Sequence, residues 1–161
     1  MLIKSNMKKT PRKKRFTGKK KINARKIVYD GIQFQSLLER DFYKKIKLFN
    51  LPLLYEPKTY EVLPAMKAPE TFRNFKTWGT KFLERSSNTQ NMKYTPDFVY
   101  EGDKHYIYVE NKGRPNESYP LRKKLFFVYL SKIKNREVWF FEPKNQVQNS
   151  IVIEKIKEIL T

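Results

Sequence analysis

The sequence predicts a domain of the α/β or α+β class, with a mixed central β-sheet flanked by helices. Apolar residues recur at helical spacing in three segments, and aromatic and β-branched stretches bounded by turn residues lie between them. The chain has 161 residues, of which 39% are hydrophobic, enough for one core but hardly for two. We therefore expect a single folded domain over residues 26–161, preceded by a basic arm over residues 1–25.

The domain is predicted to begin with a hairpin and a helix. Apolar and aromatic residues in 26–34 flank Asp30-Gly31, a dipeptide typical of tight hairpin turns. Residues 36–50 carry apolar side chains at spacings of four, four and three, which predicts an amphipathic helix. These apolar residues are Leu38, Phe42, Ile46 and Phe49.

Two strands and an insertion are expected next. Residues 53–56 and 59–63 are predicted to be strands, interrupted by Pro57. Residues 64–92 have no clean period, and we interpret them as an insertion in the domain. Four aromatic residues within this segment have the spacing of a short helical piece: Phe72, Phe75, Trp78 and Phe82.

The second half of the domain is predicted to contain a hairpin, two helices and a strand. Residues 94–100 and 105–111 are rich in aromatic and β-branched residues, and the turn between them predicts an antiparallel pair. Residues 118–134 are predicted to be helical and 137–141 a strand, and Ser150 is expected to cap the last helix. The expected apolar faces are Leu121, Leu125, Val128, Leu130 and Ile133 on the first of these helices, and Val152, Ile156, Ile159 and Leu160 on the second.

The formal net charge of +19 indicates a polyanionic partner, of which nucleic acid is the usual one. An acidic membrane surface and solubility alone are the alternatives, but no amphipathic apolar stripe accompanies the basic arm. Residues 1–26 hold twelve Lys or Arg and no acid, so the remainder carries +7. We expect DNA as the partner and no membrane. The arm residues expected to contact DNA are Lys13, Lys14, Arg15, Lys19, Lys20 and Lys21.

Other functions are excluded by composition. The chain has no Cys, which excludes disulfides, thiolate nucleophiles and zinc-thiolate sites. No apolar run approaches the roughly 18 residues of a membrane span. We expect a soluble cytoplasmic protein, or one packaged within a particle.

Asp97, Glu110 and Lys112 are the residues most suited to chemistry. Asp97 lies on the first strand of the expected hairpin and Glu110 on the second, and strand alternation places Glu110 and Lys112 on one face. Mg²⁺ typically takes one or two carboxylates together with water and phosphate oxygens, and the backbone carbonyl of Asn111 can add a third protein oxygen. Lys112 would orient, or help deprotonate, an attacking water. The alternative is a turn residue followed by a solvated strand face.

Glu39 is a fourth candidate because it falls at the edge of the apolar arc of the first helix. A carboxylate there is costly unless it has a partner, which favours a place in the metal site. Ser36 and Glu39 also match a capping box, which is the structural alternative. Glu56 also has two possible roles: it is either a residue of the site or an exposed strand residue before Pro57.

Cations follow these acidic residues along the chain. Arg122, Lys123 and Lys124 occupy the first turns of a helix, where positive charge is unfavourable unless an anion lies nearby. We interpret them as phosphate contacts, and Arg114 similarly, against the alternative of a solvated face. The lone histidine, His105, has the opposite strand parity to Glu110 and is taken as structural.

The clusters Tyr94-Thr95-Pro96-Asp97-Phe98 and Val109-Glu110-Asn111-Lys112-Gly113 resemble those of the PD-(D/E)xK nuclease superfamily. The likeness is strongest to phage endonucleases of the Holliday-junction-resolving endonuclease I type and related small phage nucleases, and it covers roughly residues 26–142. It implies a restriction-endonuclease-like core and a site of Asp97, Glu110 and Lys112, completed by Glu39. It also implies Mg²⁺ or Mn²⁺ as cofactor, a homodimer, and work in the host cytoplasm or in a virion.

Two departures from the family pattern concern its details. Residues 64–92 are longer than the minimal core, and Asn111 replaces the apolar residue often found between the acid and the lysine. The first bears on substrate choice, whereas the second is compatible with metal binding through the backbone.

The sequence thus favours a metal-dependent DNA endonuclease that acts on branched or structured DNA. The alternative is a non-catalytic DNA-binding or virion-associated protein that retains a nuclease fold. A third hypothesis, an RNA-binding module, would need stacking aromatics beside basic residues on an exposed sheet face.

Overall fold

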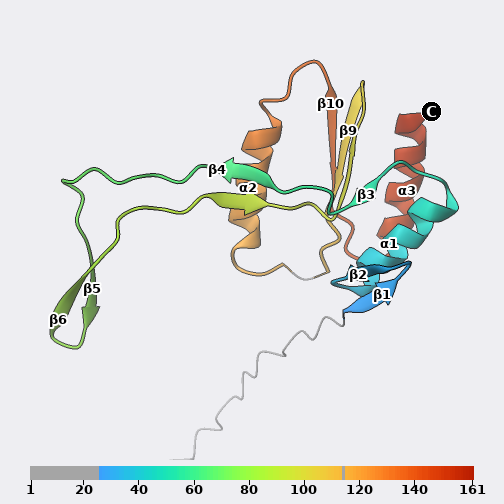
Figure 1. Cartoon of the computed structure of the whole chain (residues 1–161). Coiled ribbons are helices and arrows are strands. Elements are labelled where there is room, and N and C mark those ends of the chain that lie inside the picture. Colours follow the sequence, from blue (N-terminus) through green and yellow to red (C-terminus); the bar gives the residue numbers. More distant parts are fainter. Residues whose placement is uncertain (1–25, 114) are drawn as a thin grey trace, which may run out of the picture.

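The computed structural model describes residues 26–113 and 115–161 (Figure 1). The basic arm and Arg114, both assigned to DNA binding from the sequence, lie outside these residues. The described elements are β1 (Ile27–Tyr29), β2 (Ile32–Phe34), α1 (Leu37–Leu48), β3 (Leu54–Tyr55), β4 (Tyr60–Leu63), β5 (Asn74–Trp78), β6 (Lys81–Arg85), β7 (Met92–Tyr94), β8 (Phe98–Glu101), β9 (His105–Val109), α2 (Tyr119–Leu130), β10 (Glu137–Phe141) and α3 (Gln146–Leu160).

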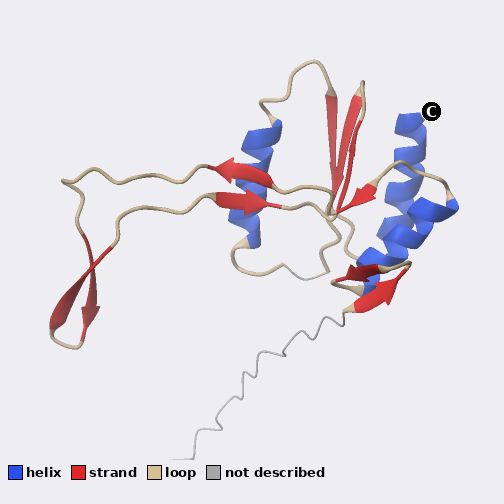
Figure 2. Cartoon of the chain, in the orientation of Figure 1, coloured by secondary structure: helices blue, strands red, loops and turns tan. Residues whose placement is uncertain are grey.

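A mixed four-stranded sheet with the order β10-β9-β8-β3 forms the centre of the molecule. β9 pairs antiparallel with β8 and parallel with β10, and both registers meet at Val109, opposite Phe98 and Phe141. Figure 2 shows α1 and α3 on one side of this sheet and α2 on the other. The prediction of a mixed sheet flanked by helices is confirmed.

The alternation of side chains along β8 and β9 creates two cores. Ile107 and Val109 face α1 and α3, where Phe42 and Ile153 pack against them. Tyr108 points to the opposite face, where it meets Phe126 of α2. Complete burial of such side chains contributes about 1.5–3 kcal/mol each. The sheet is therefore packed on both of its faces.

The predicted hairpin and the first helix are confirmed. β1 and β2 pair antiparallel around Asp30 and Gly31, whose φ angles of 54° and 73° suit a two-residue turn of this kind. Ser36 caps α1, because its side chain accepts a hydrogen bond from the backbone N–H of Glu39. Strands β3 and β4 confirm the two strands predicted on either side of Pro57.

The prediction of a short helical piece between Phe72 and Phe82 is wrong. The segment forms an antiparallel two-stranded ribbon, β5–β6, with the two-residue turn Gly79-Thr80 at its tip. Gly79 has φ +59°, which suits the first position of a hairpin loop and would interrupt a helix. The aromatic residues thus have helix-like spacings of three and four by chance, and these spacings do not reflect a helix. The description of residues 64–92 as an insertion stays a prediction.

The second helix ends earlier than predicted, and its predicted apolar face is buried only in part. α2 ends at Leu130 rather than 134, and Asn135 follows with φ 62°. Leu130 is buried as predicted, together with Tyr119 and Phe126, whereas Leu121 and Val128 are exposed. The physical reason is the aromatic surface that the helix covers. The ring of Phe126 stacks on Tyr94 at 4.4 Å between centroids and meets Tyr60, Tyr108 and Phe140.

The last helix starts earlier than predicted, and Ser150 is not its cap. α3 begins at Gln146, and the side chain of Asn145 accepts a hydrogen bond from the N–H of Gln148 at 3.0 Å. Ser150 lies within the helix, where its hydroxyl donates to the carbonyl of Gln146. None of the helices in the described ranges has the length and apolar character needed to cross a bilayer.

Candidate functional site

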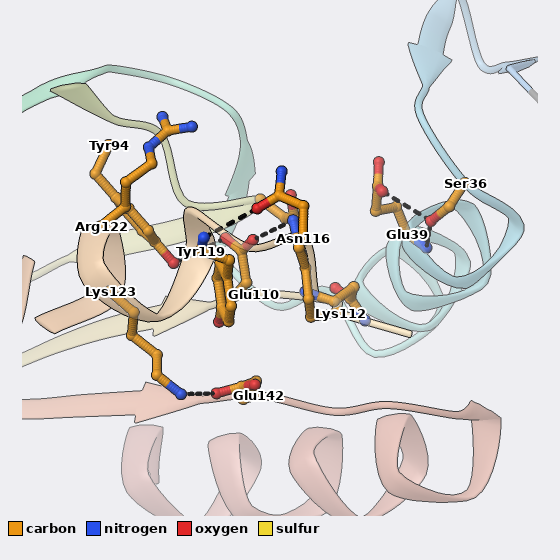
Figure 3. Close-up of polar contacts among 12 residues, drawn as sticks. Ser36, Glu39, Tyr94, Glu110, Lys112, Asn116, Tyr119, Arg122, Lys123 and Glu142 are labelled. Carbon is orange, nitrogen blue, oxygen red and sulfur yellow. Dashed lines mark hydrogen bonds and ion pairs between the residues drawn. The ribbon is translucent and has the colours of Figure 1, made fainter. Parts of the chain in front are cut away.

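A polar pocket of about 210 Å³ opens where the ends of β7, β8 and β9 meet α1 and α2. Asp97 immediately precedes β8 and Glu110 immediately follows β9, so the pairing of Phe98 with Val109 brings the two carboxylates to one end of the hairpin. Figure 3 shows side chains from α1, this hairpin end and α2 around the pocket. Its lining residues are Gln35, Glu39, Glu56, Tyr94, Thr95, Asp97, Glu110, Lys112, Asn116, Tyr119 and Arg122.

The backbone around Asp97 and Glu110 is fixed by hydrogen bonds across the strand ends. The N–H of Asn111 donates to Oδ2 of Asp97 at 2.5 Å, which closes the hairpin end. The N–H of Glu110 donates to the carbonyl of Phe141 at 2.9 Å, and Lys112 continues the pairing to Pro143 at 3.1 Å. The two carboxylates are therefore presented by backbone that is held on both sides.

Lys112 and Glu110 lie on one face, as strand parity predicts. Nζ of Lys112 is 3.1 Å from Oε1 of Glu110, and it also lies 4.9 Å from the ring centroid of Tyr119. The hydroxyl of Tyr94 donates to the other oxygen, Oε2, at 3.0 Å. Burial raises the pKa of Tyr94, and the Glu110 charge raises it further, so this hydroxyl keeps its proton and remains a donor. Both oxygens of the buried Glu110 are thereby oriented.

Glu39 forms the predicted capping contacts and also lines the pocket, while its role in a metal site stays a prediction. Its carboxylate accepts hydrogen bonds from the hydroxyl of Ser36 at 2.7 Å and from the N–H of Gln35 at 3.0 Å, which is a variant of the capping box. It also accepts from the hydroxyl of Tyr55 at 2.9 Å and lines the pocket, although it is only 6% exposed. The same carboxylate thus caps α1 and faces Asp97 and Glu110.

Glu56 joins the pocket from the end of β3. Its N–H donates to the backbone carbonyl of Asp97 at 2.8 Å, and its φ of 40° lies in the left-handed region that side chains rarely adopt. Such strain costs of the order of 1–3 kcal/mol and is concentrated at functional sites. The pocket therefore gathers four carboxylates, with Lys112 and Arg122 as the cations that line it.

Crowding of the carboxylates is evident in their proton affinities. Burial raises the pKa of Asp97 well above its usual range, and the nearby charges of Glu110 and Glu39 raise it further. Burial also raises the pKa of Glu110, against the opposing effect of Lys112. The pKa of Glu56 is raised by burial and then by Glu39 and Glu110. The pocket carries more negative charge than its own cations compensate.

The oxygen donors fit a hard divalent cation. Within residues 26–113 and 115–161, no three His, Asp or Glu side chains are close enough to form a complete metal cluster. Mg²⁺ needs only one or two carboxylates and keeps several waters, so the Asp97 and Glu110 pair meets its requirement. A cation would also relieve the repulsion that raises their pKa values. Asn111 is buried, with its N–H on Asp97 and its side chain on Asn149; a role for its carbonyl as a ligand stays a prediction.

The cations of α2 are placed differently from one another. Arg122 lines the pocket, and its guanidinium donates to the carbonyl of Lys93 at 2.8 Å. Lys123 turns to Glu142, with 2.7 Å between Nζ and Oε2 (Figure 3). Lys124 is exposed. A phosphate contact is thus best supported for Arg122, whereas Lys123 already has a counter-ion. His105 lies at the other end of β9, 3.3 Å from Glu137, as expected of a structural residue.

Sequence reasoning missed Tyr94 and Asn149. Asn149 of α3 is fully buried, accepts from Nδ2 of Asn111 at 2.8 Å and donates to the carbonyl of Leu38 at 3.1 Å. It therefore ties the residue after Glu110 to the residue before Glu39. Tyr94 carried a signal, because it is the first residue of the Tyr94-Thr95-Pro96-Asp97-Phe98 cluster. No local pattern marks Asn149, which is 38 residues from Asn111.

A family model matches residues 19–143, and it carries the description "Protein of unknown function (DUF1064)". The chain belongs to the DUF1064 family. The matched range includes every residue that lines the pocket, from Gln35 to Arg122, and it ends before Asn149. No curated protein and no solved structure matches the chain.

Replacing Asp97 by Asn should stabilise the DUF1064 protein when no divalent ion is present. The folded-state pKa of Asp97 is raised, so its contribution to stability is most favourable at low pH and is lost as pH rises from about 4 through the folded-state pKa. An amide has no charge to bury. We expect Asp97→Asn to gain about 0.5–2 kcal/mol at pH 7.5 in EDTA, and less at pH 4.5. Urea unfolding at both pH values measures this. A variant less stable than the wild type at pH 7.5 would contradict the crowding of charge.

Proposed function

We propose that this DUF1064 protein is a Mg²⁺-dependent DNA endonuclease that hydrolyses phosphodiester bonds, with Mn²⁺ as an alternative ion. The observation that carries the proposal is the meeting of Asp97 and Glu110 in a polar pocket, with Lys112 bonded to Glu110. Two carboxylates and an amine at paired strand ends suit phosphodiester hydrolysis. The net charge of +19 supports DNA as the substrate.

Asp97 and Glu110 would hold the ion, since their oxygens are the hard ligands that Mg²⁺ prefers. When bound, the ion supplies positive charge to the scissile phosphate and makes a nearby water more acidic. Tyr94 and Lys112 keep Glu110 in one orientation through its two oxygens. Lys112 also has the N–H donors to orient an attacking water; to help deprotonate that water it would act as the free amine and take up the proton.

Arg122 would bind a phosphate oxygen at the edge of the pocket. Its guanidinium can form two parallel hydrogen bonds to an oxyanion, which fixes the orientation of the DNA backbone. Glu39 and Glu56 lie on the opposite elements, α1 and the end of β3, and would hold water or a second ion. The substrate phosphate would thus lie between a cationic side and an anionic side of the pocket.

The fold would be a restriction-endonuclease-like core. This part of the proposal is supported by the antiparallel pair β8–β9 with parallel β10, by α1 before the sheet, and by α2 between β9 and β10. It is also supported by the likeness of the Pro96-Asp97 and Glu110-Asn111-Lys112 clusters to PD-(D/E)xK nucleases. Branched DNA is the proposed substrate and a homodimer the proposed active form, because two strands must be cut to resolve a junction.

A cleavage assay on four DNA forms tests the function. The full-length protein is incubated with a four-way junction, a flap, a linear duplex and a single strand, each with Mg²⁺ or with EDTA. We expect nicking only with the divalent ion, and most rapidly at the junction. Salt-sensitive binding without nicking of any form would refute the enzyme and favour a non-catalytic DNA-binding or virion-associated protein.

A further inference from the structure

The β5–β6 ribbon projects away from the rest of the molecule. Among the described strands, these two pair only with each other, and all ten of their residues are exposed. Figure 1 shows the ribbon at the end of two long segments that leave β4 and return to β7. An isolated two-stranded hairpin is marginally stable in water at best. The ribbon contributes nothing to either core, so its side chains are free for contact with another molecule.

The ribbon exposes large aromatic side chains at its tip. Trp78 and Phe82 are 70% and 74% exposed, and Phe75 is 53% exposed. Scattered single apolar residues on a surface are ordinary, but several on one small ribbon indicate a contact surface. Trp78 and Phe82 lie on either side of the Gly79-Thr80 turn.

The strand register places the cations of the ribbon on one face. Residues directly opposite each other share a face, so Trp78 lies with Lys81, Lys76 with Leu83, and Asn74 with Arg85. Nζ of Lys76 lies 5.8 Å from the ring centroid of Trp78. This cationic face has no acidic residue. The other face carries Phe75, Thr77, Phe82 and Glu84, and Glu84 is paired with Arg73 at 3.0 Å.

We propose that the β5–β6 ribbon is a DNA-binding arm that contacts DNA away from the scissile phosphate. Lys76, Lys81 and Arg85 bind backbone phosphates, and Trp78, on the same face at the tip, stacks on an unpaired base. A two-stranded ribbon also has the width that the major groove admits. The inference rests on the proposed function in taking DNA as the substrate. It adds the part of the chain that selects DNA with exposed bases.

Charge distinguishes DNA from a second copy of the chain as the occupant. In a symmetric contact between two copies, the cationic face would meet the same cationic face of the second copy. Like charges opposed across an interface are unfavourable, whereas a polyanion complements all three cations. An aromatic ring beside cations, as Trp78 lies beside Lys76 and Lys81, is also the combination that single-stranded regions of nucleic acid favour.

Binding of the full-length protein to labelled DNA in EDTA tests the ribbon without cleavage. The triple variant Lys76→Ala/Lys81→Ala/Arg85→Ala should weaken binding to linear duplex and gapped duplex alike, and lower the slope of log affinity against log salt by about 2–3. Trp78→Ala should weaken binding to the gapped duplex by about tenfold, with a smaller effect on the linear duplex.

The matched control is Lys132→Ala/Lys134→Ala/Arg136→Ala, which removes three exposed charges from the loop after α2. An equal loss of affinity and salt slope in this control and in the ribbon triple would overturn the proposal. So would a wild-type dimer that Phe75→Ala/Phe82→Ala converts to a monomer in sedimentation with DNA affinity unchanged. Thermal unfolding of the ribbon variants should match the wild type, because the ribbon lies outside both cores.

The ribbon and the nuclease can fail separately. If the wild type never nicks DNA but the ribbon variants lose binding, the nuclease function is refuted and the ribbon proposal stands. If Mg²⁺-dependent nicking occurs and the ribbon variants bind both DNA forms as the wild type does, the nuclease stands and the ribbon proposal is refuted.

Discussion

Asp97→Asn and Lys112→Ala should each lower the rate of Mg²⁺-dependent cleavage by at least about 10³-fold while leaving DNA binding largely intact. Asp97 is one of two carboxylates that would hold the ion, and the amide that replaces it is a poorer ligand for a hard cation. Lys112 supplies the cation bonded to Glu110 in the pocket. Loss of either impairs the reaction, whereas DNA binding would rest mainly on the cations that contact the backbone.

Single-turnover cleavage of the preferred DNA, with binding measured separately by anisotropy, checks this expectation. Asp103→Asn and Lys104→Ala are the matched controls, because both residues are exposed in the turn at the opposite end of the same hairpin. They should cleave as the wild type does. Wild-type rates in Asp97→Asn or Lys112→Ala would remove the site from the reaction.

The expected effect of Asp97→Asn on stability tests the role of the same residue independently. A carboxylate kept for structure should cost stability when it is replaced. With a carboxylate kept for metal chemistry, the protein should be less stable than its amide variant as long as no cation is bound. We expect the variant to be inactive and, in EDTA, more stable than the wild type, because the charges of Glu110 and Glu39 then have one less neighbour to repel.

Asn149→Ala should lower the free energy of unfolding by about 2–4 kcal/mol. Asn149 is fully buried, and its loss leaves the side-chain amide of Asn111 and the carbonyl of Leu38 without these partners. The two hydrogen bonds connect α3 to the end of β9 and to α1, so the elements that carry Glu110 and Glu39 should also lose their mutual alignment. Each kcal/mol corresponds to a fall of about 2–4 °C in the melting temperature of a domain of this size.

Urea and thermal unfolding measure the stability effect, and cleavage at a temperature well below the transition measures the alignment. Ser150→Ala is the control on the next residue of α3, which is exposed and bonds only to its own helix among the contacts seen. It should change stability by no more than about 0.5 kcal/mol. A similar loss in both variants would show that Asn149 acts through the helix alone.

Much of the fold follows from local patterns that a sequence states directly. Asp30-Gly31 marks a turn because few residues accept positive φ, and the apolar spacing of 36–50 predicts α1 because one face must be buried. The same locality explains the errors. Aromatic residues around Trp78 repeat at intervals that suit a helix, but Gly79 in the left-handed region turns the chain into a ribbon.

The sequence by itself determined that Asp97, Glu110 and Lys112 belong together. Hairpin pairing joins the first two, and strand alternation places the third beside the second. Only the tertiary structure decided that Glu39 both caps α1 and faces this pair, that Glu56 enters the pocket on a strained backbone, and that Asn149 connects the two sides. The physical reason is the distance along the sequence over which each signal acts. Periodicity and turn chemistry act over a few residues, whereas Asn149 and Leu38 are 111 residues apart and meet only because α1 and α3 pack on the same face of the sheet.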